Sequence, residues 1–257
     1  MNVVAVVIPA YNEAATIRDV VERTLNVMPS VVVVDDGSVD GTRDALAGLP
    51  VTVIVNERNQ GKAHSLWRGA RVAIEGGATS IVTLDGDGQH HPEDLPKILR
   101  AAALKPNAII VGSRLHARDI IPRARYRANR FANFWIAWAA GQPLADSQSG
   151  FRHYPAHVFG TLDVRHDRWS SFVFESEVIV AAARAGIEIV CVPIAVTYAN
   201  PARASHFRPV ADIAKITMMI AGRLLATGLN LPGLVRSLRR AAPAGTYAAP
   251  ARIQRKQ

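Results

Sequence analysis

The first half of the chain alternates short β-branched apolar runs with longer segments of helical spacing. Five runs are apolar on both faces, as expected for strands of a parallel sheet that helices cover: VVAVVI (3–8), VVVV (31–34), VTVIV (51–55), SIVTL (80–84) and AIIVG (108–112). Segments such as NEAATIRDVVERTLNVM and PEDLPKILRAAAL separate these runs and carry apolar residues at helical intervals. The pattern predicts an α/β fold, an open doubly wound, mainly parallel sheet with helices on both faces.

The second half is less regular. We expect a helix from about 127 to 140, a second helix around 171–185 and a strand pair around 187–198. An apolar stretch then runs from Pro209 to about Thr227, but Asp212, Lys215 and Arg223 interrupt it. A membrane-spanning helix needs about 20 mainly apolar residues, so these charges favour an amphipathic helix that lies in the headgroup region. A helix packed on the domain core is the alternative.

These patterns divide the chain into three parts. We expect a catalytic domain over residues 1–208, an amphipathic membrane-surface helix over 209–234, and a basic, disordered tail over 235–257. The amino-terminal stretch MNVVAVVIPAYNE has no basic n-region. We interpret it as a first strand rather than a signal peptide, and expect a cytoplasmic protein.

Charge is spread unevenly along the 257 residues, whose net charge is +9. The segment from Arg203 onward holds ten Lys/Arg and one acid, and the stretch 112–130 holds six arginines and one acid. Such local patches favour a particular anionic partner over general solubility. A single cysteine, Cys191, excludes an internal disulfide framework.

Acidic residues follow three of the predicted strands, at Pro9–Glu13, Asp35–Ser38 and Asp85–Gln89. In open α/β sheets, ligands bind beyond the carboxyl ends of the strands. Each acidic segment taken alone is more typical of a turn or a helix cap. Three of them at successive strand ends predict a site for a nucleotide diphosphate and a metal.

The segment Asp85-Gly-Asp87-Gly-Gln89 supplies two carboxylates and an amide oxygen close together. Oxygen ligands of this kind suit Mg²⁺ or Mn²⁺, which keep open positions for substrate phosphates. An ordinary acidic turn is the alternative for this motif. His90 and His91 follow it, and we expect them to orient the turn rather than to bind zinc, because no further ligands stand at suitable spacing.

The other two strand ends carry candidates for nucleoside contacts. Tyr11 can stack on a base and Glu13 can bind a ribose hydroxyl, while Asp35 and Asp36 can bond a base edge or a ribose. Lys62, in ERNQGKAHS, stands at a predicted helix start, where a lysine can neutralise a phosphate. A solvated surface lysine is the alternative.

Together these motifs resemble family-2 glycosyltransferases of the A-type fold. The segments that carry the resemblance, in order, are VVIPAYNE, VVVVDDGSVDGT, NQGKAHSLWRGA, TLDGDGQHHPED, VGSR and DSQSGFR. The chain more narrowly resembles the polyprenyl- and dolichyl-phosphate hexosyltransferases, the dolichyl-phosphate mannose synthase-like group, over roughly residues 1–215.

The resemblance implies roles for particular residues. Asp85, Asp87 and Gln89 would hold Mg²⁺ or Mn²⁺, with Asp85 also near the ribose. The implied nucleotide-sugar pocket comprises Pro9, Tyr11, Glu13, Asp36, Lys62 and Asp85, and Arg114 would meet the diphosphate. The implied catalytic set is Asp85, Asp87, Arg114 and Asp146.

The acceptor side is predicted from basic residues. A phosphate acceptor is already largely an anion at neutral pH and needs cations rather than a general base. Arg127 and Arg130, in the arginine-rich stretch, are the first candidates, and a solvated charged loop is the alternative for this stretch. The resemblance adds Arg203, Ser205 and His206, although Ala202 and His206 replace the glycine and lysine of the family's phosphate-binding loop.

Asp146 matches the first position of the family's D-x-x-x-G-F-R motif, which implies that it helps to order the acceptor side. A purely structural pair between Asp146 and Arg152 is an equal alternative. Glu175 and Glu177 are the candidate bases if the acceptor is a hydroxyl.

The sequence therefore predicts a metal-dependent, inverting transfer of a hexose from a nucleotide-sugar, of the GDP-mannose or UDP-glucose type, to a polyprenyl phosphate such as undecaprenyl or dolichyl phosphate. Inversion is implied by the resemblance. We expect peripheral association with the anionic cytoplasmic face of a membrane, and leave open a membrane-protein partner or a homo-oligomer. A family-2 enzyme that glycosylates a saccharide or protein hydroxyl is the alternative. We expect no nucleic-acid partner, because three acidic strand ends would repel its phosphates.

Overall fold

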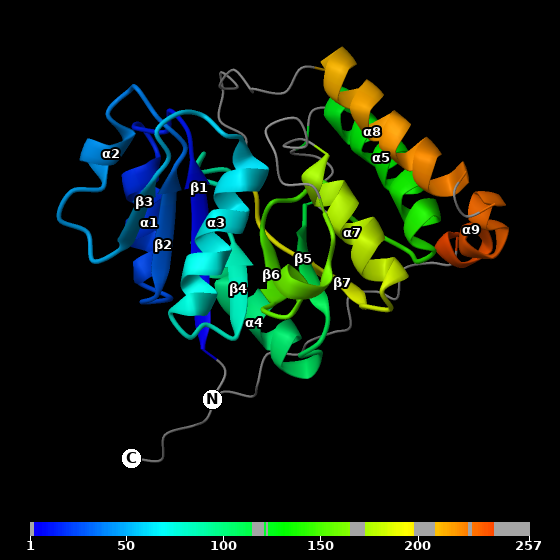
Figure 1. The fold of residues 1–257 in the computed structure, drawn as a ribbon, viewed down its shortest axis with the longest axis horizontal. Helices are drawn as coiled ribbons and strands as arrows, with labels where there is room; N and C mark the ends of the chain where they lie inside the picture. The colour runs from blue at the N-terminus through cyan, green and yellow to red at the C-terminus, as the bar shows by residue number, and fades with distance from the viewer. Residues whose placement is uncertain are drawn as a thin grey trace.

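A seven-stranded sheet forms the centre of the computed structural model, which describes residues 3–114, 121, 123–164, 173–197, 209–225 and 228–238 (Figure 1). The strand order is β3-β2-β1-β4-β6-β5-β7. The strands are β1 (Val4–Ala10), β2 (Val31–Asp35), β3 (Thr52–Val55), β4 (Ser80–Thr83), β5 (Ile109–Ser113), β6 (Arg152–Pro155) and β7 (Ile189–Pro193).

Helices cover both faces of this sheet, as the apolar strands require. They are α1 (Ile17–Leu25), α2 (Thr42–Ala45), α3 (Lys62–Glu75), α4 (Leu95–Leu104), α5 (Arg123–Ala140), α6 (Val158–Thr161), α7 (Phe174–Arg184), α8 (Pro209–Leu225) and α9 (Leu231–Ser237), with 3₁₀ turns η1 (Pro92–Asp94) and η2 (Gly228–Asn230). Helices α1 and α4 share a core with inward residues of β1 and β2. Helix α3 covers the opposite face of the same strands, and α5, α7 and α8 pack beside it over β5.

The predicted α/β class and mainly parallel sheet are confirmed, with one antiparallel exception. Strand β6 runs antiparallel to both neighbours, β4 and β5, so the sheet is mixed. The pattern did not predict β6 because Arg152 and His153 are polar, yet both are buried. Tertiary pairing between two apolar strands overrides the low strand propensity of this segment.

Three expected elements differ in the structure. Helix α5 begins at Arg123 rather than near 127. Strand β3 is an edge strand with exposed Thr52 and Val53, so it is not covered on both faces. The predicted strand pair around 187–198 is wrong, because β7 is a single strand parallel to β5, followed within the described residues by one isolated bridge between His90 and Val196.

A helical layer lies to one side of the sheet, where α8 runs alongside α5 and α9 closes their end (Figure 1). The indole Nε1 of Trp138 in α5 donates to the carbonyl of Leu229, 2.8 Å away, which ties the turn between α8 and α9 to α5. Within the described ranges, no one helix has the length and hydropathy to cross a membrane; only the bent pair Ile216–Leu225 and Gly228–Ser237, at 106°, does so in combination.

Candidate functional site

The carboxyl ends of β1, β2 and β4 meet at one edge of the sheet. These strands are parallel, and the register places Ala10 beside Asp35 at the ends of β1 and β2. Asp85 follows β4 by two residues. The parallel pairing therefore brings the three predicted acidic segments to one edge, as the sequence predicted.

The two neighbouring acids at the end of β2 have different surroundings. Asp36 is buried and accepts hydrogen bonds from Asn56 Nδ2 at 2.7 Å, from the Gln60 N–H at 2.9 Å and from the Gly61 N–H at 2.8 Å. Its carboxylate therefore braces the turn that leads into α3. Bracing a turn is the role that is typical of each acidic segment taken alone, and Asp36 has it here.

Asp35 has unused acceptor capacity. Its Oδ1 accepts from the Ser38 N–H at 3.0 Å, whereas its buried Oδ2 has no hydrogen-bond partner among the described residues and lies 3.6 Å from Arg43 Nε. A buried carboxylate oxygen without a hydrogen bond is costly. Of the two acids, Asp35 is therefore the better placed to accept a hydrogen bond from a ligand.

The turn after β1 is locked onto the loop after β2. Asn12, at φ +56°, donates its N–H to Ser38 Oγ at 2.9 Å, and the Glu13 N–H donates to Thr42 Oγ1 at 2.8 Å. Tyr11 begins this turn, and Pro9 lies buried inside β1 beside Val34. The predicted nucleoside residues Pro9, Tyr11 and Glu13 thus lie on a backbone that hydrogen bonds hold rigidly.

An ion-paired lysine lies between two carboxylates at the centre of this edge. Lys62 is the first residue of α3, and its Nζ lies 2.7 Å from Asp85 Oδ1 and 2.8 Å from Glu175 Oε1. Burial alone would lower the pKa of Lys62, but the charges of Asp85 and Glu175 outweigh it and raise that pKa above its ordinary value. Burial likewise would raise the pKa of Asp85, and Lys62 instead brings it down to about 2. Both groups are charged at neutral pH.

Gly150 packs directly against the other side of the Asp85 carboxylate. A Cβ on Gly150 would lie 2.5 Å from Asp85 Oδ2, which is less than any real contact allows. The carbonyl of Gly150 accepts a hydrogen bond from Thr83 Oγ1 at 2.6 Å, which ties this segment to β4. Gly150, the glycine of the D-x-x-x-G-F-R motif, therefore leaves room for the Asp85 carboxylate.

His90 is buried beside the same carboxylate. Its Nδ1 lies 3.8 Å from Asp85 Oδ2, and its ring packs on Phe151 with centroids 5.8 Å apart. Burial lowers the pKa of His90 to about 4, so the imidazole is neutral at pH 7. His91 instead hydrogen-bonds Thr197 Oγ1 through Nε2 at 2.7 Å.

The oxygen donors of the predicted metal site fit a hard divalent cation. Asp85 and Asp87 are followed by Gln89, whose N–H donates to Asp87 Oδ1 at 3.0 Å and closes the turn. In the part of the chain that the structure describes, no group of three or more His, Cys, Asp or Glu residues is placed to hold a metal. Two carboxylates and an amide oxygen suit a Mg²⁺ or Mn²⁺ site that substrate phosphate oxygens complete. Asp85 already attracts one cation, Lys62.

Arg114 and Asp146 form a buried ion pair. Arg114 Nε lies 2.9 Å from Asp146 Oδ2, its NH2 lies 3.1 Å from Oδ1, and its backbone N–H also donates to Oδ2 at 3.1 Å. Burial would raise the pKa of Asp146, but Arg114 outweighs this and lowers it. The alternative pairing of Asp146 with Arg152 is wrong, since Arg152 donates to the backbone carbonyls of Ser147, Ser149 and Glu175.

The predicted acceptor residues are only partly described. Arg127 and Arg130 are exposed on α5, where neither has an ion-pair partner among the described residues. Phe131 and Phe134 continue the same exposed face of α5, with 63% and 40% of their surface accessible. Arg203, Ser205 and His206 lie outside the described residues.

The sequence missed two contributors to the site. Glu175 was considered only as a base, although it is an ion-pair partner of Lys62, and Gly150 was noted only as part of a motif. The available signal for Glu175 was the pair of acids inside the apolar run SFVFESEV, because buried acids require partners.

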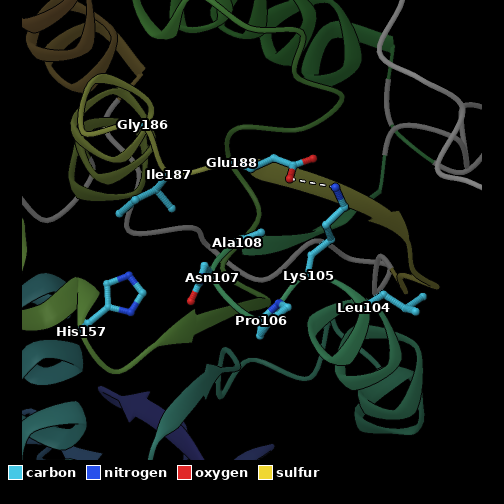
Figure 2. Close-up of a pocket in the computed structure, with 9 residues that line it drawn as sticks. All are labelled: Leu104, Lys105, Pro106, Asn107, Ala108, His157, Gly186, Ile187 and Glu188. Carbon is cyan, nitrogen blue, oxygen red and sulfur yellow. Dashed lines mark hydrogen bonds and ion pairs between the residues drawn. The ribbon is translucent and has the colours of Figure 1, made fainter.

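A pocket of about 370 Å³ lies at the opposite edge of the sheet (Figure 2). It is lined by residues just before β5 and β7, together with His157 after β6. Lys105 and Glu188 pair across it at 3.1 Å. Because the amino ends of β5 and β7 border it, this pocket is separate from the acidic edge.

Comparisons with known proteins agree with this architecture. The sequence profile of Glycosyl transferase family 2 matches residues 5–159. The UDP-N-acetylglucosamine–dolichyl-phosphate N-acetylglucosaminyltransferase of Methanococcus voltae is 29% identical over 220 residues, which cover 77% of this chain and 86% of the relative. The undecaprenyl-phosphate mannosyltransferase of Micrococcus luteus is 30% identical over 206 residues, covering 74% and 82%.

Solved structures show the same fold. Glucosyl-3-phosphoglycerate synthase from Mycobacterium tuberculosis, in complex with Mn²⁺, UDP and glucosyl-3-phosphoglycerate, superposes with a TM-score of 0.58. The two chains are 18% identical, and the match covers 88% of this chain and 79% of the other. The fold is thus that of the A-type glycosyltransferases.

The chain belongs to glycosyl transferase family 2. It is a glycosyltransferase homologous to polyprenyl-phosphate sugar transferases.

Proposed function

We propose that this enzyme transfers a hexose from a nucleotide-sugar to a polyprenyl phosphate at the cytoplasmic face of a membrane. The observation that carries the proposal is the Lys62–Asp85 pair beside Arg114–Asp146, at the sheet edge where three acidic segments meet. The named activities of the Methanococcus and Micrococcus relatives support this acceptor class. The donor panel of the transfer assay distinguishes mannose, glucose and N-acetylhexosamine as the transferred sugar.

The donor would bind across the ends of β1, β2 and β4. Asp35 offers a buried oxygen to a base edge, and Tyr11 and Glu13 lie on the neighbouring turn. Asp85, Asp87 and Gln89 would hold Mg²⁺ or Mn²⁺, which supplies charge stabilisation for the departing nucleoside diphosphate. Glucosyl-3-phosphoglycerate synthase, which has the same fold, was solved with Mn²⁺ and UDP, and this supports a metal and a nucleotide in the proposed site.

Two cations of the chain itself would stabilise the leaving diphosphate. Lys62 stands at the start of α3, where the helix N-terminus adds positive potential. Asp146 holds the Arg114 side chain by two hydrogen bonds, so the guanidinium is oriented before a ligand arrives. Preorganised charge of this kind lowers the barrier because it needs no rearrangement during reaction.

A phosphate acceptor suits the charges better than a hydroxyl acceptor does. A hydroxyl would need a carboxylate base, but Glu175 is paired with Lys62 and Glu177 with Arg223 at 3.0 Å. A phosphate needs cations instead, and exposed Arg127 and Arg130 lie on α5. In this proposal the phosphate oxygen attacks the anomeric carbon directly, with inversion of configuration.

The helical layer would contact the lipid surface. Large apolar side chains are exposed on α5, α8 and α9 and directly after α9, among them Phe131, Met218, Leu225, Leu231, Val235 and Leu238. Apolar side chains beside basic residues are typical of peripheral helices on anionic membranes. The proposed division is therefore a catalytic part (1–208), a membrane-surface part from 209 and a basic tail; the expected boundary at 234/235 falls inside α9, so the membrane-surface part extends to the end of that helix at Ser237.

A transfer assay tests this proposal. Purified protein is mixed with Mn²⁺ or Mg²⁺, undecaprenyl or dolichyl phosphate, and each of a panel of labelled nucleotide-sugars, and the lipid phase is extracted. We expect label in the lipid phase from one donor, and its loss with EDTA and with Asp87→Ala. The exposed Asp44→Asn variant, in α2, is the control and should retain transfer.

Two other outcomes would contradict parts of the proposal. Transfer of label to a saccharide or protein, and none to lipid, would identify the hydroxyl-acceptor enzyme instead. Transfer that survives EDTA would remove the metal from the mechanism.

A further inference from the structure

The first turn of α7 carries three consecutive buried polar side chains. Glu175, Ser176 and Glu177 have 9%, 0% and 9% of their surface accessible. Successive residues of a helix point about 100° apart, so the three side chains leave the turn in different directions. Buried polar groups are costly unless they are paired. The hydrogen-bond and ion-pair partners of these three side chains therefore show which parts of the molecule the turn connects.

Each of the three side chains contacts a different part of the molecule. Glu175 binds Lys62 at 2.8 Å, on the site side. Ser176 Oγ accepts a hydrogen bond from Gln148 Nε2 at 2.9 Å, and the Gln148 N–H donates to Asp146 Oδ1 at 3.0 Å. Glu177 points the other way.

Glu177 contacts the helical layer. Its Oε1 lies 3.0 Å from NH2 of Arg223, which belongs to the last turn of α8. Helix α7 lies between α3 and the α5–α8 pair in Figure 1. One helical turn thus contacts both the lysine of the proposed donor site and the helix of the proposed membrane surface.

Hydrogen bonds hold the backbone of this turn at both glutamates. The Glu177 N–H donates to the carbonyl of Val173 at 2.8 Å, and the Glu175 carbonyl accepts from Arg152 NH1 at 2.7 Å. Packed, hydrogen-bonded elements move as units rather than deform locally. Glu175 and Glu177 therefore stand on one hydrogen-bonded turn, which is the connection between them used below.

We propose that the Glu177–Arg223 ion pair is a positioning contact, through which α8 sets the placement of Glu175 and of Lys62 at the donor site. Arg223 then acts on the nucleotide without touching it. The inference deepens the proposed function and rests on it, because Lys62 is assigned there to the leaving diphosphate. If α8 shifts within the helical layer, the affinity of the enzyme for its nucleotide-sugar donor changes.

Nucleoside diphosphate binding tests the inference without any lipid acceptor. Calorimetry with UDP and with GDP, each with Mn²⁺, gives the dissociation constants of the wild type and of Arg223→Met. We expect about fivefold weaker binding in the variant, the lower end of typical coupling between sites. Arg184→Gln removes one exposed positive charge from the far end of α7 and should bind like the wild type.

Two further variants distinguish positioning from a merely structural role. In a Glu175→Gln background, Arg223→Met should weaken binding no further. The reason is that Arg223, in this inference, acts on the donor site only through the Glu175–Lys62 ion pair, which the background variant has already removed. The exchanged pair, Glu177→Arg with Arg223→Glu, should restore the wild-type affinity to within about twofold, as a re-formed pair of opposite charges would. If Arg223→Met does not fold, Glu177→Gln takes its place.

The outcomes separate this inference from the proposed function. A lowered melting temperature with unchanged nucleotide affinity would make the pair structural only and overturn the inference. Additive effects of Glu175→Gln and Arg223→Met would also overturn it, since Arg223 would then act by another route. A wild type that binds neither UDP nor GDP would overturn the nucleotide-sugar function itself, and this inference with it.

Discussion

The acidic edge of the sheet and the helical layer beside it differ in whether their charged side chains are paired or exposed. At the edge, Lys62, Asp85, Arg114 and Asp146 are paired at 2.7 to 2.9 Å and largely withdrawn from water. On α5, the Arg127 side chain is exposed beside Phe131, which has 63% of its surface accessible. The edge is organised before any ligand arrives, whereas the layer presents charge and apolar surface outward.

This difference matches the size of the proposed ligands. A nucleotide-sugar is small, so fixed and mutually oriented charges can discriminate its transition state from its ground state. A lipid surface is large and fluid, and many weak contacts suffice, each basic residue near it contributing about 1 kcal/mol. Substitutions at the edge should therefore act strongly one at a time, and substitutions on the layer weakly.

The largest expected effect is at Asp85. Asp85→Asn removes the charge that faces Lys62 and a proposed metal ligand, so we expect transfer to fall on the order of 10²- to 10³-fold. Initial rates with a labelled donor measure the loss. An effect no larger than that of the exposed Asp44→Asn control would place the chemistry elsewhere.

The second largest loss of transfer is expected from a steric change at the acidic edge. Gly150→Ala would place a Cβ 2.5 Å from Asp85 Oδ2 and displace the carboxylate. Misplacement of a reacting group by about 1 Å can cost roughly 100-fold in rate. Gly160→Ala is the matched control, because a Cβ there meets nothing within 4 Å. Equal rates for the two variants would mean that the Asp85–Gly150 contact does not matter for transfer.

On the helical layer the effect should be smaller and confined to one substrate. We expect the double variant Arg127→Ala/Arg130→Ala to raise KM for polyprenyl phosphate about tenfold, since charge-assisted contacts to a phosphate contribute individually modest energies. The donor KM should stay the same. Arg100→Ala, an exposed arginine on α4, is the control. A change in donor KM alone would contradict the assignment to the acceptor.

The smallest effect concerns stability rather than transfer. His153 is buried in β6, and burial lowers its pKa from 6.5 to about 4. Between these values the unfolded chain binds a proton that the folded chain excludes, so the free energy of unfolding decreases as the pH falls from about 6.5 to 4. Urea unfolding of the wild type and His153→Leu at pH 7 and pH 5 measures this, and the variant should lose less stability. An identical decrease in both proteins would assign the pH dependence to other groups.

The sequence predicted the sheet well where apolar patterning is local. Strands β1, β2 and β4 appear as continuous apolar runs, and each is followed by the acids that now share an edge. Parallel strands align their carboxyl ends, so the clustering of these segments followed from the fold class alone. Strand β6 was missed because its RHYP sequence has no strand pattern and is held by pairing on both sides.

The sequence by itself determined the fold class, the edge at which chemistry-bearing residues gather, and the family to which they belong. Only the tertiary structure decided which charges pair. It joined Asp146 to Arg114 rather than to Arg152, gave Lys62 to both Asp85 and Glu175, and committed Asp36 to the turn before α3. Apolar periodicity depends on residues that are close in the sequence. The Arg114–Asp146 ion pair joins side chains 32 positions apart, so it depends on how the elements pack.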